Sequence, residues 1–97
     1  MDTHAILVQL RKGVLEYCVM ARLQHAPSYG LQLAADLSRF PDLFASEGTL
    51  YPLLARLRKQ GMVETTWQES TSGPPRRYYQ LTAQGEAALA SFKDAWG

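Results

Sequence analysis

The hydrophobic pattern of this chain changes its period at Gly61, and this change constrains the fold more than any other feature. Before Gly61, apolar residues recur at the spacing of an α-helix. After it, Met62–Glu69 alternates apolar or β-branched residues with polar ones, as a half-buried strand does. The pattern therefore predicts helices first and a small sheet second, within one domain of 97 residues.

Three helices are predicted before Gly61. The first runs from about Ala5 to Gln24. Ser28 is the expected N-cap of the second helix, which runs from Tyr29 to about Arg39. The third is expected to begin at Ser46 and to end at Gly61, because a glycine that follows basic residues is typical of position C′.

A β-hairpin and a last helix are predicted after Gly61. The second strand is expected at Arg76–Leu81, and a turn-rich loop, Ser70–Pro75, joins it to the first. Thr82 is the expected N-cap of a helix over Ala83–Trp96. Three helices followed by a hairpin is the plan of a winged helix-turn-helix, a mainly α fold whose small two-stranded hairpin is the wing.

The first helix carries apolar residues on two sides. Leu7, Leu10 and Val14 belong to one stripe, whereas Leu15 and Val19 belong to another. A helix that lies on the surface of a small domain needs only one apolar stripe. The pattern therefore indicates a second cover, such as another copy of the chain; the alternative is a central helix buried on all sides within a single chain.

The third helix is expected to turn one face to the core and the other outward. At 100° per residue, the core face holds four leucines: Leu50, Leu53, Leu54 and Leu57. The outward face is small at its start and basic toward its end: Gly48, Pro52, Ala55, Arg56 and Lys59. In a helix-turn-helix the later helix enters the DNA major groove. This face fits such a contact, although an ordinary solvated helix face looks similar.

The predicted wing carries adjacent arginines near its tip. Gly73, Pro74 and Pro75 lead directly into Arg76 and Arg77. A wing that presents basic residues adds contacts to DNA phosphates. The alternative is a surface turn followed by a solvated arginine pair.

Several classes of function find no support in the sequence. His4 and His25 lack metal-ligand spacing, and a single cysteine, Cys18, allows neither an internal disulfide nor a cysteine-rich metal site. No phosphate loop or nucleophile elbow is present, so we expect neither an enzyme nor a cofactor. There is no apolar run of about 18 residues and no secretory signal pattern, so we expect a cytoplasmic location.

The sequence resembles the PadR family of bacterial transcriptional regulators. The likeness lies in SEGTLYPLLARLRKQGMV, which contains the Gly-Thr-Leu-Tyr-Pro start of a recognition helix, and in the wing, SGPPRRYYQLTAQGEAAL. Arg11-Lys12-Gly13 and Tyr29-Gly30 also fit the family pattern. The two long motifs stand in the family's order and cover much of the chain.

The resemblance implies a homodimeric repressor that binds a pseudo-palindromic operator in double-stranded DNA. Residues 1–82 would form the DNA-binding domain and residues 83–97 the dimerisation helix. The positions expected to contact DNA lie in the second helix, the third helix and the wing: Tyr29, Ser46, Thr49, Tyr51, Pro52, Arg56, Lys59, Gly73, Arg76 and Arg77.

The resemblance also implies a dimer made by the first and last helices. The positions expected at its interface are Leu7, Leu10, Val14, Leu89, Phe92 and Trp96. Some members of the family bind small aromatic compounds between the subunits, and Cys18, Phe92 and Trp96 are the candidates to line such a site. Trp96 can instead serve packing alone, and the same fold can serve as a protein–protein interaction module without DNA.

Overall fold

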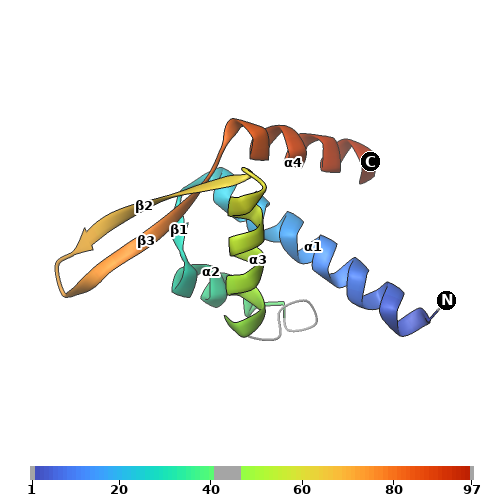
Figure 1. The fold of residues 1–97 in the computed structure, drawn as a ribbon, viewed down its shortest axis with the longest axis horizontal. Helices are drawn as coiled ribbons and strands as arrows, with labels where there is room; N and C mark the ends of the chain where they lie inside the picture. The colour runs from blue at the N-terminus through green and yellow to red at the C-terminus, as the bar shows by residue number, and fades with distance from the viewer. Residues whose placement is uncertain (1, 41–46, 97) are drawn as a thin grey trace.

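The computed structural model describes residues 2–40 and 47–96, without the side chain of Trp96. The predictions for Ser46 and for the Trp96 side chain therefore lie outside the described part of the chain. Figure 1 shows the helices and strands in chain order: α1 (Thr3–His25), β1 (Ser28–Tyr29), α2 (Gly30–Leu37), α3 (Glu47–Lys59), β2 (Val63–Ser70), β3 (Gly73–Leu81) and α4 (Ala83–Trp96).

The sheet has three antiparallel strands in the order β1-β3-β2, one more than predicted. Ser28 pairs with Tyr79, and Tyr29 pairs with Tyr78. The prediction that Ser28 caps the second helix is wrong: Tyr29 occupies the N-cap position and makes no side-chain capping bond. The edge of β3 offers backbone partners to this extended segment, and a partner so distant in sequence leaves no local pattern.

The hairpin is longer than predicted, so the assignment of Ser70–Pro75 to a loop is wrong. β3 begins at Gly73, and Ser70 pairs directly with Gly73 across the turn. Proline lacks a backbone donor, and strands accept it where that edge has no partner. β1 pairs only with Tyr78 and Tyr79, so the edge of β3 away from β2 is unpaired at Pro74 and Pro75.

The core is built from one side of each helix and the base of the sheet. All four predicted core leucines of α3 are at most 3% exposed. α1 contributes buried side chains only from its C-terminal half: Leu15, Val19, Met20 and Leu23. Its N-terminal half extends away from the rest of the molecule (Figure 1), and Leu7 and Leu10 are 44% and 53% exposed. The alternative of an α1 buried on all sides is therefore wrong for the single chain.

Two predicted caps are confirmed. Gly61 has φ of 78°, and its N–H donates to the Arg58 carbonyl while the N–H of Met62 donates to the Leu57 carbonyl. These bonds form a Schellman motif, which ends α3 and turns the chain into β2. At the other side of the hairpin, the Thr82 hydroxyl accepts from the N–H of Gly85 and caps α4.

Candidate nucleic-acid interface

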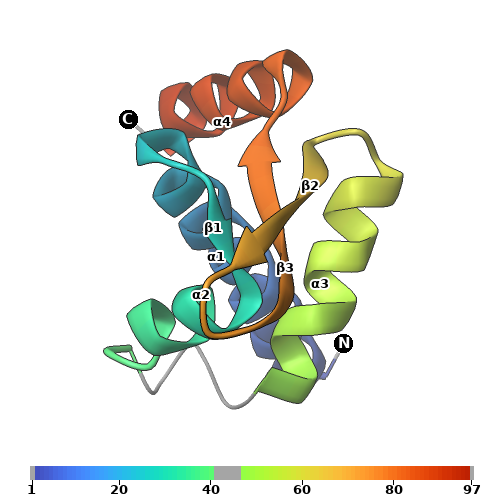
Figure 2. The ribbon, with the colours of Figure 1, turned by 90° about the vertical axis from the view of Figure 1, so that its left-hand side faces the viewer.

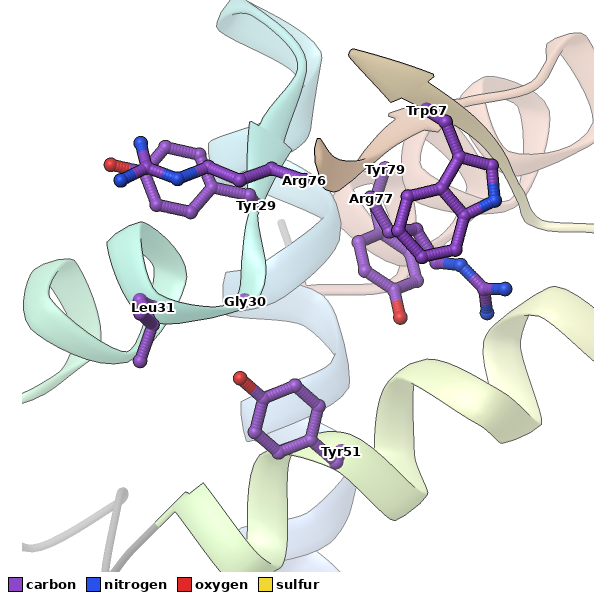
Figure 3. A pocket seen from close by; sticks show the side chains of 8 residues that line it. All are labelled: Tyr29, Gly30, Leu31, Tyr51, Trp67, Arg76, Arg77 and Tyr79. Atoms are coloured by element: carbon purple, nitrogen blue, oxygen red, sulfur yellow. The ribbon is translucent and has the colours of Figure 1, made fainter. Parts of the chain in front are cut away.

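The wing, the start of α2 and the N-terminal half of α3 meet on one side of the molecule. Figure 2 looks onto this side and shows α2 and α3 flanking the hairpin. Between them lies a cavity of about 310 Å³, which we call the wing pocket (Figure 3). Its lining residues are Tyr29, Gly30, Leu31, Tyr51, Trp67, Arg76, Arg77 and Tyr79. Four of the predicted DNA-contacting residues therefore converge here: Tyr29, Tyr51, Arg76 and Arg77.

The two wing arginines lie on opposite faces of β3, because successive side chains of a strand alternate. The Arg76 guanidinium lies over the Tyr29 ring, 4.4 Å from its centroid. The Arg77 guanidinium lies 4.9 Å from the centroid of the Trp67 ring. Both distances fit cation–π contacts. Each arginine therefore has its own aromatic support, as Figure 3 shows.

Tyr29 serves both as this support and as part of the sheet. Its ring meets Tyr78 edge-on, with a centroid separation of 5.2 Å. The predicted contact of Tyr29 with DNA therefore competes with its packing between Tyr78 and Arg76. The other supporting ring, Trp67, is 63% exposed and was not among the predicted contacts. The alternating pattern places Trp67 on the core side of its strand, but β2 extends beyond the core at that point.

Tyr51 reaches from α3 toward the start of α2. A Cβ atom added to Gly30 would lie 2.7 Å from the Tyr51 hydroxyl, so the ring rests against the glycine backbone (Figure 3). Tyr51 is nevertheless 43% exposed. Arg58 follows Tyr51 by seven residues, which returns a helix to nearly the same side. Exposed Arg58 is therefore a further candidate, which the helical spacing alone could have added to the predicted set.

Arg56 lies on a different side of α3. Its guanidinium forms an ion pair with the carboxylate of Glu16 in α1. It does not line the wing pocket. Thr49, Pro52 and Lys59 are exposed as predicted, and so is Gly73 at the wing turn. The predicted contact set thus divides between a side of α3 facing the wing and a side facing α1.

The residues predicted for a dimer interface differ in exposure. Leu7 and Leu10 are exposed and Val14 is half-buried. Leu89 is fully buried within the single chain, so its placement at the interface is corrected: it is a core residue with no surface left to bury against a partner. Phe92 is half-buried and stacks on Tyr17, with ring centroids 4.7 Å apart.

The candidate ligand-lining residues do not all come together. Cys18 lines a cavity of about 360 Å³ between α1 and α2, together with Tyr17, Ala21, Arg22, Asp36, Leu37, Arg39 and Phe40. Phe92 is not among these residues. Burial raises the pKa of the Cys18 thiol, which disfavours the reactive thiolate.

An ion pair joins α1 to α2 at the edge of this cavity. The Arg22 Nε donates to Asp36 Oδ2 at 2.8 Å, and Gln32 donates to Asp36 Oδ1 at 3.0 Å. The hydrogen bond from Arg22 is the main reason that the pKa of Asp36 is lowered. The pair is partly exposed and links two helices, as a structural contact does.

Residues 2–40 and 47–96 contain no group of three or more His, Cys, Asp or Glu that could hold a metal ion. Among the helices of this part of the chain, none has the length and apolar character needed to cross a membrane.

Comparisons with known proteins agree with this geometry. The model of the transcriptional regulator PadR-like family matches residues 19–91. A transcriptional regulator of Mycobacterium tuberculosis is 38% identical over 76 residues, which cover 75% of this chain and 69% of that protein.

Solved structures give the same relationship. A PadR-like transcription factor from Bacteroides fragilis has a TM-score of 0.82 and 43% identity, covering 95% of this chain and 88% of the other. A PadR-like regulator from Bacillus cereus has a TM-score of 0.81 and 40% identity, covering 92% and 86%.

Proposed function

The chain belongs to the PadR-like family of transcriptional regulators, and on this premise we propose that it represses transcription by binding operator DNA as a homodimer. The family consists of regulators rather than enzymes. One observation carries the proposal: Tyr51 of the recognition helix and the arginines Arg76 and Arg77 of the wing converge on one pocket (Figure 3).

α3 enters the major groove with its N-terminal half in this proposal. Gly48 and Pro52 are exposed there and keep the helix surface small, which permits a close approach. Arg76 and Arg77 then reach phosphates from the two faces of the wing, and phosphate contacts give affinity and register. Arg58 and Lys59 extend the positive charge along the helix.

A second copy of the chain covers the N-terminal half of α1 in this proposal. The exposed apolar side chains there are Ile6, Leu7 and Leu10. Burial of apolar surface drives association, and α4 completes the interface as the dimerisation helix. A two-fold dimer places its recognition helices in successive major grooves, which calls for a pseudo-palindromic operator.

Release by a small aromatic effector is the last part of the proposal. The cavity beside Cys18 would receive such a compound, and Tyr17 of its lining stacks on Phe92. An effector releases DNA only if it binds more tightly to a dimer geometry that no longer matches the operator.

The test is a salt series of fluorescence anisotropy on the DNA upstream of the protein's own gene and on a random duplex. Two arginine–phosphate contacts per protomer predict a slope of log K against log salt of about −4 for a dimer. The upstream duplex should bind more tightly than the random one. If no duplex binds in a salt-dependent way, DNA binding is rejected, and a protein–protein interaction module takes its place.

A further inference from the structure

A helix that lies in the major groove has a phosphodiester backbone on each side of it. The wing pocket accounts for one side of α3, where Tyr51 and the wing arginines lie. The other side of α3 faces α1, and Arg56 meets Glu16 there. The second backbone should therefore pass close to the junction between α1 and α3.

That junction is hollowed and carries polar and basic groups. A cavity of about 210 Å³, which we call the α1–α3 notch, is lined by Lys12, Gly48, Thr49, Pro52, Leu53 and Arg56. Lys12 belongs to α1 and the other lining residues belong to α3. Gly48, Thr49 and Pro52 are exposed and small, so a ligand can approach the helix closely between the cations.

Three charged side chains belong to this junction: Lys12 and Arg56 line the notch, and Glu16 pairs with Arg56. Arg56 is paired with Glu16, and their side chains are 42% and 27% exposed. Lys12 is exposed and makes no ion pair or hydrogen bond with the described residues. Lys12 precedes Glu16 by four residues, so both lie on the side of α1 that faces α3.

We propose that the α1–α3 notch binds a DNA backbone phosphate, and that this phosphate replaces Glu16 as the partner of Arg56. Lys12 is the second cation of the site. This inference rests on the proposed function and adds α1 to the DNA-contacting elements. Exposed ion pairs are weak, so the Arg56–Glu16 pair opens readily when a stronger acceptor arrives.

Glu16 competes with phosphate for the guanidinium of Arg56. Its carboxylate occupies Arg56 in the free protein, and it repels the phosphate once Arg56 has turned to DNA. Glu16 should therefore lower the affinity for every DNA sequence, since phosphate contacts carry no base information.

The experiment compares two charge-removing variants with matched controls in the salt series. Lys12→Gln should weaken binding to all duplexes about two- to fivefold for each protomer, the range of an exposed charge contact. It should also reduce the salt slope by about 2 for a dimer. Lys93→Gln on α4 also removes one lysine charge and should change neither, once light scattering shows that this variant keeps the dimer mass.

The second variant, Glu16→Gln, should strengthen binding by about the same factor. The gain should become smaller when Arg56 is also replaced by alanine, because only the direct repulsion between Glu16 and the phosphate is then left to remove. Glu86→Gln, at an exposed position of α4, is the matched control, and light scattering checks that it keeps the dimer mass. Circular dichroism checks that each variant keeps its fold.

The outcomes separate this inference from the proposed function. If wild type binds DNA in a salt-dependent way but Lys12→Gln behaves as Lys93→Gln does, the notch is not a phosphate site. If Glu16→Gln weakens binding, Glu16 holds Arg56 in its DNA-contacting position, and the exchange is refuted. If wild type binds no DNA at all, the proposed function itself fails.

Discussion

The wing pocket and the N-terminal half of α1 differ in whether their side chains pack against other residues of the same chain. Each wing arginine rests on an aromatic ring of the same chain, Tyr29 for Arg76 and Trp67 for Arg77. Leu7 and Leu10 have no such cover and are about half exposed. A single chain therefore completes the proposed DNA-contacting surface, whereas in the proposed dimer a second copy would cover the apolar surface of α1.

The largest expected effect comes from placing charge on the uncovered half of α1. Full burial of a leucine contributes about 1.5–3 kcal/mol, and the double variant Leu7→Asp, Leu10→Asp places four charges in a dimer interface. We expect the dimer dissociation constant to rise by a factor of about 100 or more. Light scattering at micromolar concentration should then report a monomer mass.

Leu31 provides the matched control for that variant, because it is 57% exposed on α2. Leu31→Asp should leave the mass unchanged. A monomeric wild type would contradict the proposed interface, and so would a double variant that remains dimeric.

A smaller effect tests whether the Trp67 ring holds the Arg77 guanidinium in place. Trp67→Ala should weaken DNA binding about two- to fivefold for each protomer, because an exposed cation–π contact is worth about 0.5–1 kcal/mol. Arg77→Ala should weaken binding and also reduce the salt slope. Once Arg77 is alanine, the further replacement of Trp67 should add little.

The double-variant cycle in anisotropy distinguishes support from direct contact. Additive losses would mean that Trp67 touches DNA by itself, for example by stacking, and not through Arg77. Trp67→Phe keeps an aromatic ring and should restore most of the binding. Thermal unfolding of the single variants should change little, because Trp67 is largely exposed.

The smallest expected effect concerns the contact that holds the C-terminal half of α1 to α2. The hydrogen bond from Arg22 lowers the pKa of Asp36 in the folded state. A carboxyl with a depressed folded pKa stabilises the fold above its unfolded pKa, about 3.9, and this stabilisation is lost as pH falls through the folded pKa. Asp36→Asn should therefore cost about 0.5–1 kcal/mol at pH 7.

Urea unfolding at pH 7 and near pH 3 checks this prediction. The difference between wild type and Asp36→Asn should be larger at pH 7 and should shrink as acid protonates Asp36. A difference that stays constant with pH would mean that the loss arises from packing rather than from the ion pair.

Much of the fold follows from local pattern. The leucine spacing of α3, the C′ glycine at Gly61 and the cap at Thr82 are all confirmed, because helix faces and caps depend on residues within one turn. The predicted DNA-contacting residues Tyr51, Arg76 and Arg77 do meet in the wing pocket. Their spacing already placed them on a recognition helix and a wing.

The missed features depend on partners far along the chain. Ser28 joins a strand 51 residues away in sequence, at Tyr79, and no local signal marks that pairing. Leu89 lies on the same narrow stripe as Phe92, yet only the packing of α4 on the rest of the chain buries it completely. Trp67 lies on the same side of β2 as the buried Val63, but it is farther along the strand, where β2 extends beyond the core.

The sequence alone determined the order of helices and strands and the amphipathic face of α3, because these arise from backbone bonding and periodicity within short segments. Only the tertiary structure decided which neighbour each charged side chain meets. Arg56 and Arg77 are both predicted DNA contacts, yet one is paired with a carboxylate of α1 and the other lies on an indole ring. These partners depend on how separate helices and strands pack in space, and each partner determines how freely its arginine can bind a phosphate.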